Sequence, residues 1–483
     1  MKTITSKNAE ASSVRFPKAP AGQSPSGVTR RKFIGQTTAV GAAAFLLPRL
    51  ARAQDGARPL FIEGYAGQVS YAPGDEVTLH ISTSAPKFTL EIARLGLKPE
   101  ILWKTPSPVP GAEHAIPEAA SSLGCAWPVA LRVKIPADWR SGYYQVTLRA
   151  SDHGGKFVQR GSRRVQSDCF FVVHSATPGR DTNILLQLTT NTYNAYNNWG
   201  GTSLYGYNGR GNVQGHRVSF ERPPESQFGN WELPFVQWAE RNGYQLDYAV
   251  NTDREFNPDL LKHYRLGLSV GHDEYWSAPM RDHLEKFIRD GGNVAFFSGN
   301  TCCWQVRSED GGRALTCWKE YFHKDPGYPT GDHRLLTSLW SHHLVQRPEN
   351  QLTGVCFLWD GFHRSHEQFM DGSGAFTVHR PDHWIFEGTG LKRGDEFGGK
   401  DSIVGYECDG CELTWRNGLC SIPGPISARP ALRLVCASPT ARVGPDPGRQ
   451  HDRTTLHAPP GPGRRAQLLD RRPGLRLWPF FPE

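Results

Sequence analysis

The sequence predicts a multidomain α+β protein, in which an N-terminal β-sandwich is followed by a doubly wound α/β domain with β-rich additions. From residue 54 to about 177, short runs of alternating polar and apolar residues are separated by proline and glycine turns, which is typical of antiparallel strands. From residue 178 to 418, strand-like and helical segments alternate, which indicates a parallel sheet. The length of 483 residues suffices for two or three domains of about 150 residues each.

Residues 1–53 have the three parts of a cleaved export signal. Arg30, Arg31 and Lys32 precede a short apolar run at 39–47, and small residues at 51–53 provide a cleavage site. Paired arginines directly before the apolar run resemble a twin-arginine leader. No later segment is long and apolar enough to span a membrane, so we expect a periplasmic or secreted protein without an integral membrane segment after cleavage.

The elements of the two domains follow from local patterns. Within residues 54–177, strands are expected at 76–81, 143–148 and 169–173. In the second domain we expect, in order, a buried strand at 183–188, a helix at 231–242, strands at 245–250 and 266–270, a helix after Ser277, and a strand at 293–298. Residues from 317 to about 406 are rich in glycine, aromatic residues and histidine, and are expected to wrap this core.

Charge is distributed unevenly along the chain. The net charge of +8 comes from the leader, with nine basic residues and one acidic residue, and from residues 419–483, with ten arginines and no lysine. The body between them is mildly acidic, so no nucleic-acid partner is expected. Residues 419–483 also contain 12 of the 36 prolines and no long periodic segment, so they form an atypical tail that a shifted reading frame would explain.

Three strands of the predicted α/β domain end in polar or aromatic sequence. After the first strand, 15 of the 22 residues at 191–212 are Asn, Tyr or Gly, which suits neither a helix nor a strand. His272 and Glu274 follow the strand at 266–270, and Asn300 follows the strand at 293–298. Because ligands of open α/β sheets bind beyond the carboxyl ends of the strands, these residues predict one converging site.

The spacing of His272 and Glu274 indicates a shared direction. Residues two apart on an extended backbone point to one side, and Asp273 then points away. Glu274 could bind a metal ion or act as a general base, and His272 could orient it or a bound water. The alternative is a capped helix start, in which Asp273 or Glu274 interacts with the first helical turn.

Several sequence islands together resemble a known enzyme family. They are NTYNAYNNWGGTSLY, GHDEYWS, GGNVAFFSGN, RPENQLTG, RPDHWIFEGTGL and VGYECDGCE, and they are similar to the large subunit of N,N-dimethylformamidase and its wider family. The likeness runs from about Ile62 to Gly418. It implies a β-sandwich joined to a glutamine-amidotransferase-like α/β domain, a mononuclear ferric iron held by two tyrosines and one glutamate, and hydrolysis of a small tertiary amide.

The resemblance also implies roles for individual residues. Glu274 matches the glutamate ligand and has a catalytic role, while His272 and Asn300 match the catalytic histidine and asparagine beside the metal. One tyrosine ligand falls in the TYNAY segment, where Tyr196 is preferred and Tyr193 is the alternative. The other is expected from the sandwich, where Tyr144 occupies the matching position and Tyr143 is the alternative, so the metal would lie at the domain junction.

The implied chemistry suits this donor set. Phenolate and carboxylate oxygens favour ferric iron, which polarises an amide carbonyl or acidifies a bound water. His272 would protonate the leaving nitrogen, and Asn300 would hold the developing oxyanion. The expected partner is a small amide substrate; a homo-oligomer is compatible with the sequence, and a small subunit is not evident.

Two other functions compete with this interpretation. Residues 267–271 fit the G-x-S-x-G pattern of serine hydrolases, but Ser269 lies inside the predicted strand instead of at a sharp turn. A non-catalytic extracytoplasmic protein for a small molecule or carbohydrate is the second alternative, because Trp199, Trp276 and Trp304 could stack on a ligand.

Histidine and cysteine patterns are less specific. No G-x-C-x-G elbow is present, so a cysteine nucleophile is rejected. His342, His343 and the residues at 363–366 suggest a second metal site, but surface or packing roles are favoured. The single C-x-x-C at 408–411 lacks the second pair of a four-ligand zinc site.

Overall fold

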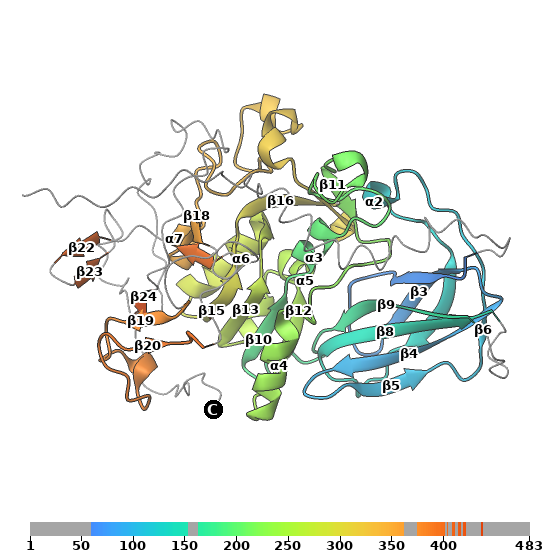
Figure 1. The fold of residues 1–483 in the computed structure, drawn as a ribbon, viewed down its shortest axis with the longest axis horizontal. Coiled ribbons are helices and arrows are strands. Elements are labelled where there is room, and N and C mark those ends of the chain that lie inside the picture. The colour runs from blue at the N-terminus through green and yellow to red at the C-terminus, as the bar shows by residue number, and fades with distance from the viewer. Residues whose placement is uncertain are drawn as a thin grey trace, which may run out of the picture. The chain divides into compact units, whose positions relative to one another are not determined.

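The computed structural model describes residues 59–152, 163–361 and 374–400, together with 403, 408–410, 414–416, 419–421 and 436–437. The predicted leader at 1–53, most of the tail at 419–483, His363, His366 and Cys411 lie outside the described residues. The described chain is a mixed α and β structure with many sheets and few helices (Figure 1). No helix in this part is long and apolar enough to cross a membrane.

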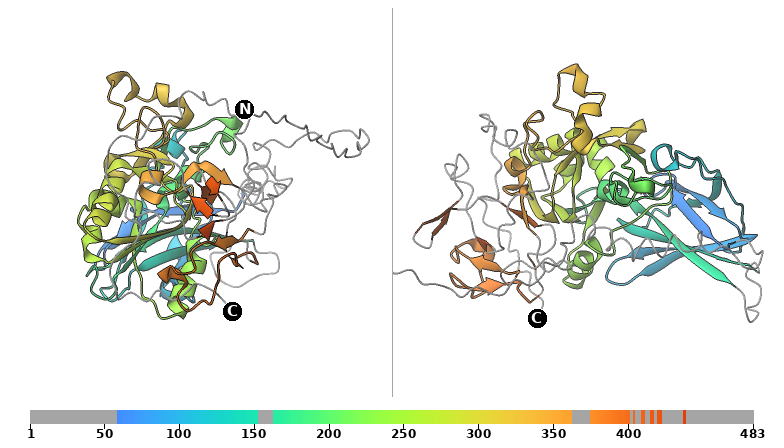
Figure 2. Two further views of the ribbon diagram at one scale, coloured as in Figure 1. Left: turned by 90° about the vertical axis from the view of Figure 1, so that its left-hand side faces the viewer. Right: turned by 45° about the horizontal axis from the view of Figure 1, so that its top comes forward.

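Two sheets near the N-terminus share one apolar core. The first has the order β1-β3-β7, and the second has the order β2-β9-β8-β4-β5 with β6 beside β4 (blue to teal in Figure 2). Their strands are β1 (Ile62–Ala66), β2 (Ser70–Tyr71), β3 (Glu76–Thr83), β4 (Lys87–Leu95), β5 (Glu100–Lys104), β6 (Val109–Pro110), β7 (Val129–Lys134), β8 (Gly142–Ser151) and β9 (Arg164–Val173).

Alternation along these strands explains the core. Val77, Leu79 and Ile81 of β3 are fully buried and pack with residues of the facing sheet, such as Leu90 and Val146. Apolar residues at every second position therefore give each sheet one apolar face, and the two faces enclose a sandwich core. A short helix, α2 (Ala120–Leu123), lies in the connection between β6 and β7.

A four-stranded parallel sheet forms the centre of the next region. Its order is β12-β10-β13-β15, and its strands are β10 (Ile184–Leu188), β12 (Asp247–Val250), β13 (Leu266–His272) and β15 (Asn293–Gly299). The helices among them are α3 (Thr190–Tyr196), α4 (Glu232–Arg241), α5 (Asn251–Phe256) and α6 (Ala278–Arg289). The strands and helices that the sequence predicted here are present (Figure 1).

Helices cover both faces of this parallel sheet. Leu186 and Leu188 of β10 pack in one cluster with α4, whereas Leu185 packs in another cluster with α6. Because successive strand residues point to opposite faces, α4 and α6 lie on opposite sides, as in a doubly wound sheet. Ser277 caps α6 by accepting a hydrogen bond from the Met280 amide at 3.4 Å.

Additional short strands lie between and after the strands of the parallel sheet in the chain. One sheet has the order β11-β17-β16-β14, with β11 (Arg217–Ser219), β14 (Tyr275–Ser277), β16 (Trp304–Glu309) and β17 (Ala314–Thr316). Three smaller ones pair β18 (Cys356–Gly361) with β21 (Cys408–Gly410), β19 (Phe376–Val378) with β20 (Glu396–Phe397) and β24 (Cys436–Ala437), and β22 (Thr414–Arg416) with β23 (Leu419–Ser421). The remaining helical pieces are α7 (Asn350–Thr353) and the 3₁₀ turns η1 (Arg210–Asn212), η2 (Leu260–His263), η3 (Asp310–Gly312), η4 (Lys319–Lys324), η5 (Tyr328–Thr330) and η6 (Trp384–Phe386).

One local prediction was wrong. The Asn- and Tyr-rich stretch was expected to suit neither helix nor strand, but its first residues form α3. The reason is a set of tertiary contacts. The Asn191 side chain donates to the Tyr275 carbonyl at 3.1 Å, and the Asn191 backbone amide donates to the Asn251 side-chain oxygen at 2.8 Å. These bonds satisfy groups that would otherwise compete with the helix backbone, so long-range contacts override local propensity.

Polar contacts tie the sandwich to the parallel-sheet region. The Ser141 hydroxyl accepts a hydrogen bond from the Tyr248 amide at 2.8 Å, and Arg94 forms an ion pair with Glu240 at 2.8 Å. The Tyr143 ring stacks on Phe228 with centroids 4.0 Å apart. Residues on both sides of this junction are therefore buried together.

Candidate active site

Polar residues gather where β13 and β15 end. β13 ends at His272, Glu274 follows it, and Asn300 follows β15. His272, Glu274 and Asn300 are all buried, and the parallel pairing of β13 with β15 brings His272 opposite Gly299. The predicted convergence of these three residues at the carboxyl edge of the sheet is present in the structure.

Glu274 is contacted from several sides. The His272 Nε2 atom lies 3.4 Å from one carboxylate oxygen, and the Asn300 side-chain amide donates to the other at 3.5 Å. Its backbone amide donates to the Thr192 hydroxyl of α3 at 3.1 Å, and its carbonyl accepts the Trp304 amide at 2.8 Å. The carboxylate is therefore held by a fixed backbone, which supports precise placement of its oxygens.

Three tyrosine hydroxyls meet beside this carboxylate. Tyr205 donates to the Glu274 carboxylate at 3.0 Å, and its oxygen lies 2.9 Å from the Tyr196 hydroxyl and 2.7 Å from the Tyr275 hydroxyl. Tyr196 is the last residue of α3, Tyr205 follows in the next loop, and Tyr275 begins β14. We call Tyr196, Tyr205, Tyr275 and Glu274 the tyrosine–glutamate cluster.

Burial sets the protonation of these phenols. It raises the pKa of Tyr205 and of Tyr275 well above the usual range, and the nearby charge of Glu274 raises both further. A phenolate at this position therefore needs positive charge among the gathered oxygens. This is the electrostatic condition under which a cation would be bound here.

A buried lysine lies against the cluster. The Lys319 ammonium is 3.2 Å from the centre of the Tyr205 ring and 4.9 Å from that of Trp304. Burial lowers the pKa of Lys319, while neighbouring carboxylates, including Glu274, act in the opposite direction. Lys319 has a φ of 53°, an unusual value for a residue with a side chain, and its amide donates to the Thr337 carbonyl at 2.9 Å.

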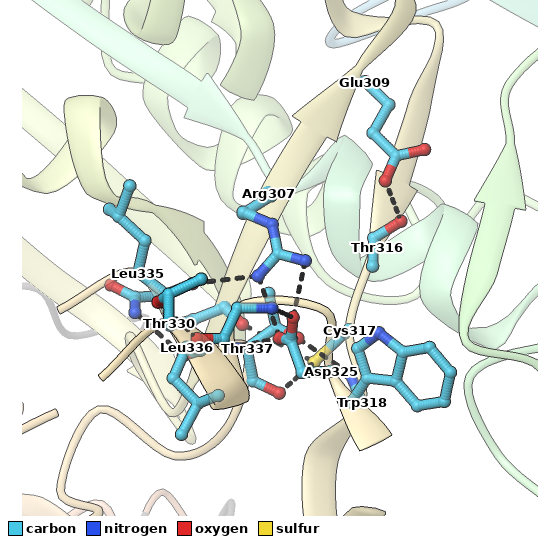
Figure 3. A network of polar contacts seen from close by, with 12 residues as sticks. Arg307, Glu309, Thr316, Cys317, Trp318, Asp325, Thr330, Leu335, Leu336 and Thr337 are labelled. Carbon is cyan, nitrogen blue, oxygen red and sulfur yellow. Dashed lines mark hydrogen bonds and ion pairs between the residues drawn. The ribbon is translucent and has the colours of Figure 1, made fainter. Parts of the chain in front are cut away.

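A polar network anchors the segment that carries Lys319 (Figure 3). Arg307 of β16 makes two hydrogen bonds of 2.8 Å to the Asp325 carboxylate, and that carboxylate also accepts the Thr337 amide at 3.0 Å. These donors lower the pKa of Asp325 to about 2 against the effect of burial. Because Thr337 in turn holds Lys319, the network fixes the lysine backbone over the cluster.

A second network lies behind the site. Asp273 points away from Glu274, as the spacing predicted, and accepts hydrogen bonds from Gln187 at 2.9 Å and Ser269 at 2.8 Å. Ser269 lies within β13, is buried, and also contacts the Ser298 hydroxyl at 2.9 Å. This position is not the sharp strand-to-helix turn that a serine nucleophile needs.

The structure separates the tyrosines that the sequence left open. Tyr196 belongs to the cluster, whereas the Tyr193 hydroxyl donates to Glu232 at 2.5 Å. Tyr144 packs in the sandwich core, where its hydroxyl donates to the Arg140 carbonyl at 2.6 Å. The Tyr143 hydroxyl donates to Ser226 at 2.9 Å.

The second tyrosine beside Glu274 is therefore Tyr205, and the expectation of Tyr144 or Tyr143 from the sandwich does not match this geometry. The signal for Tyr205 was present in the sequence, because it ends the same NTYNAYNNWGGTSLY island that contains Tyr196. Tyr275 lies in GHDEYWS, next to Glu274. Lys319 had no local signal, since its place depends on contacts with residues around 337.

The other tryptophans and histidines considered from the sequence pack against protein side chains. Trp276 is fully buried with the Arg254 guanidinium 4.1 Å from its ring centre, and Trp199 meets Trp127 edge to face. The His342 ring lies 4.4 Å from both the Phe322 and His343 rings. Within the described residues, no three side chains of His, Cys, Asp or Glu are grouped as metal ligands.

A cavity of about 380 Å³ lies on the sandwich beside Tyr65 and Trp127, and Glu274 is not among its lining residues. The chemistry of the donor set identifies the site better than cavity size. Two phenol oxygens and a carboxylate within hydrogen-bond distance are hard donors that fit a ferric ion, and Tyr205 links the other two groups.

Comparison with known proteins identifies the family of the chain. Residues 89–466 match the family described as N,N-dimethylformamidase beta subunit-like, C-terminal. The N,N-dimethylformamidase beta subunit of Paracoccus aminophilus is 28% identical over 33% of this chain and 26% of its own length. The N,N-dimethylformamidase beta subunit of an Alcaligenes species is 26% identical over the same shares.

The match thus spans about a quarter of the length of these curated relatives. The family match is much longer, because it covers most of the chain and includes Tyr196, Tyr205, Glu274 and Lys319. The chain therefore belongs to the N,N-dimethylformamidase beta subunit-like family.

Proposed function

We propose that this chain is a metal-dependent amidohydrolase that cleaves the C–N bond of a small amide, with a mononuclear ferric iron bound by Tyr196, Tyr205 and Glu274. The observation that carries the proposal is a chain of oxygen donors, in which the Tyr205 oxygen lies 3.0 Å from the buried Glu274 carboxylate and 2.9 Å from the Tyr196 oxygen. The relatives named as N,N-dimethylformamidase subunits support the reaction class.

Iron bound by these oxygens would supply Lewis acidity toward an amide carbonyl or a water. The protein groups around the donors supply the remaining chemistry. His272, whose Nε2 lies 3.4 Å from the Glu274 carboxylate, would deliver the proton that the leaving amine nitrogen needs, since an amide anion is a poor leaving group. The Asn300 side-chain amide, which donates toward the Glu274 carboxylate at 3.5 Å, would donate to the substrate oxygen that gains negative charge.

Lys319 contributes by position and charge. Its ammonium lies over the Tyr205 ring and is shielded from water. A fixed cation beside the phenols stabilises the negative charge that the donor set carries when all three groups are ionised. Tyr275 donates to the Tyr205 oxygen and thereby orients it.

The setting of this activity follows from the family and from the sequence. Because both relatives are named as beta subunits, we propose that the chain works in an assembly. The Arg30-Arg31 leader supports export to the periplasm or beyond. The parallel sheet with helices on both faces is the arrangement expected of a glutamine-amidotransferase-like domain.

The test is a metal analysis with a visible absorption spectrum of the full chain after reconstitution with iron. We expect about one iron per chain, an absorption band from phenolate-to-iron charge transfer, and release of amine from N,N-dimethylformamide or another small amide. Tyr205→Phe should shift and weaken the band and abolish turnover.

Tyr193→Phe is the matched control, because it removes a buried tyrosine hydroxyl that contacts a different glutamate. It should leave the band and the iron content unchanged. A folded protein that takes up no iron, or a band of unchanged position and intensity in Tyr205→Phe, would overturn the proposed site.

A further inference from the structure

The two tyrosines of the proposed donor set stand at the ends of one short loop. Residues 197–204 connect Tyr196 to Tyr205, and the Leu204 amide closes the loop by donating to the Ala195 carbonyl at 3.0 Å. The Tyr196 and Tyr205 rings are consequently 4.4 Å apart, with their oxygens at 2.9 Å. The loop conformation therefore sets the separation of the two phenol oxygens.

The sandwich contacts this loop at α2 and at Trp127. The Ser121 hydroxyl makes a hydrogen bond of 2.7 Å with the Thr202 hydroxyl, and the Trp127 ring meets Trp199 edge to face at 5.6 Å. Gly200 approaches the α2 backbone so closely that an added Cβ would lie 2.7 Å from the Ser121 nitrogen. Its φ of 88° also favours glycine.

The opposite side of the loop is held by a buried arginine. Arg222 donates to the Trp199 carbonyl at 2.6 Å and to the Asn194 side chain at 3.0 Å. Burial lowers the pKa of Arg222 to about 9. The loop thus contacts both the sandwich and Arg222, and a change in its conformation would break these contacts.

We infer that the sandwich acts as a positioning element for the proposed iron site. Ser121 of α2 and the neighbouring Trp127 fix the separation of the Tyr196 and Tyr205 oxygens through their contacts with the loop at Thr202, Gly200 and Trp199. The inference rests on the proposed function. It assigns the sandwich a role without a metal ligand, in place of the expected donation of Tyr144 from that domain. Ser121, Thr202 and Gly200 are positioning residues, since they act through the two tyrosines.

The main test variant is Gly200→Ala, because its Cβ would meet the α2 backbone and not a flexible side chain. The matched control is Gly211→Ala. Gly211 also has a positive φ, at 66°, but an added Cβ there would have no atom within 4 Å. Both variants therefore carry backbone strain, and only the first disturbs the contact with α2.

Two readouts are needed. In the iron-loaded protein, Gly200→Ala should shift the phenolate charge-transfer band and weaken iron binding about tenfold to a hundredfold, whereas Gly211→Ala should leave both unchanged. In the metal-free protein, hydrogen exchange of the peptide that contains the Leu204 amide should become at least about tenfold faster in Gly200→Ala alone.

A pair of milder variants distinguishes an effect on the position of the tyrosines from an effect on folding. Thr202→Val removes the hydroxyl that contacts Ser121 and should give a smaller band shift, while Thr202→Ser keeps the hydroxyl and should restore the wild-type band. If Gly200→Ala and Gly211→Ala give equal exchange and equal spectra, the inference is overturned. If the wild type binds no iron, the proposed function fails, and the exchange measurement alone decides whether α2 holds the loop.

Discussion

Among the residues that the structure describes, two buried tyrosine–glutamate contacts differ in their surroundings. At one, the Tyr193 hydroxyl donates to Glu232 at 2.5 Å; at the other, the Tyr205 hydroxyl donates to Glu274 at 3.0 Å. Both glutamates are almost fully buried. Residue type and burial therefore do not distinguish a structural pair from a candidate ligand site.

The number and charge of the neighbours distinguish the two contacts. One oxygen of Glu232 accepts the Tyr193 hydroxyl together with the amide and hydroxyl of Thr189, and burial raises the pKa of Glu232 to about 7. Among the described residues, no lysine, arginine or histidine forms an ion pair with it. Only neutral groups donate to that oxygen, which suits a structural role.

Glu274 has a different environment. His272, Asn300 and Tyr205 all contact its carboxylate, and the Lys319 ammonium lies over the Tyr205 ring. Phenol oxygens gather at this carboxylate, and these hard oxygen donors suit the binding of a metal cation. The groups around each tyrosine–glutamate pair, and not the pair itself, therefore distinguish a candidate ligand site from a structural contact.

The largest expected effect separates the two glutamates by metal binding. Glu274→Gln removes a charged ligand and should weaken iron binding by about a thousandfold or more. Glu232→Gln should retain the affinity of the wild type, since Glu232 lies outside the cluster. Equilibrium titration with iron and a competing chelator measures both. Equal losses of iron affinity in the two variants would show that the surroundings of Glu274 do not distinguish it from Glu232.

The next prediction concerns the anchoring of Lys319, a feature that the Glu232 pair lacks. Asp325→Asn breaks a buried ion pair with Arg307 and leaves that guanidinium poorly compensated, so unfolding should become easier by about 3 kcal/mol or more. Turnover should also fall, because Thr337 and Lys319 lose their support. Denaturant unfolding and amide hydrolysis check these two effects.

The control is another aspartate–arginine pair in the same segment. Asp332→Asn removes the partner of Arg334 at 2.6 Å, but this pair is exposed to water. The midpoint of unfolding and the turnover should therefore stay as in the wild type. A similar loss in both variants would show that the Asp325 network has no special link to the site.

A pH profile tests the structural character of Glu232. Its pKa is about 7 in the folded protein and near 4.5 when unfolded, so the folded state binds the proton more tightly. The corresponding stability is fully present below pH 4.5 and is lost as the pH rises to 7 and beyond, amounting to about 3 kcal/mol. Glu232→Gln should remove this dependence.

The difference between wild type and variant is the quantity to measure, because burial also raises the pKa of Glu349 to about 7. Unfolding free energies at pH 5 and pH 8 give it directly. If the difference between the two proteins is the same at both pH values, Glu232 does not carry a raised pKa in the folded state.

Part of the site was predictable from local rules. His272, Glu274 and Asn300 were predicted because strand ends of a parallel sheet meet at one edge and residues two apart share a side. Tyr196 and Tyr193 could not be separated by sequence, since both lie in α3 and differ only in what the tertiary structure places beside them. One faces Tyr205 and the other faces Glu232.

The remaining features depend on long-range packing. The strands of the sandwich followed from alternation, but the placement of Tyr144 in its core depends on which face the register buries. Lys319 reaches the cluster because its segment folds back onto residue 337, and no local pattern encodes that contact. The helix α3 formed for the same reason, through bonds to Asn251 and Tyr275.

The smallest expected effect comes from Tyr193→Phe, which removes one donor from Glu232 and keeps the ring in place. The loss of stability should be about 1 kcal/mol near neutral pH. Because the Tyr193 hydrogen bond lowers the pKa of Glu232, its removal should raise that pKa further and extend the loss of stability to higher pH. Unfolding measured from pH 6 to pH 9 would show this shift. An unchanged profile would mean that the Thr189 donors alone hold the carboxylate, so that Tyr193 contributes by packing, as its contact with Phe170 allows.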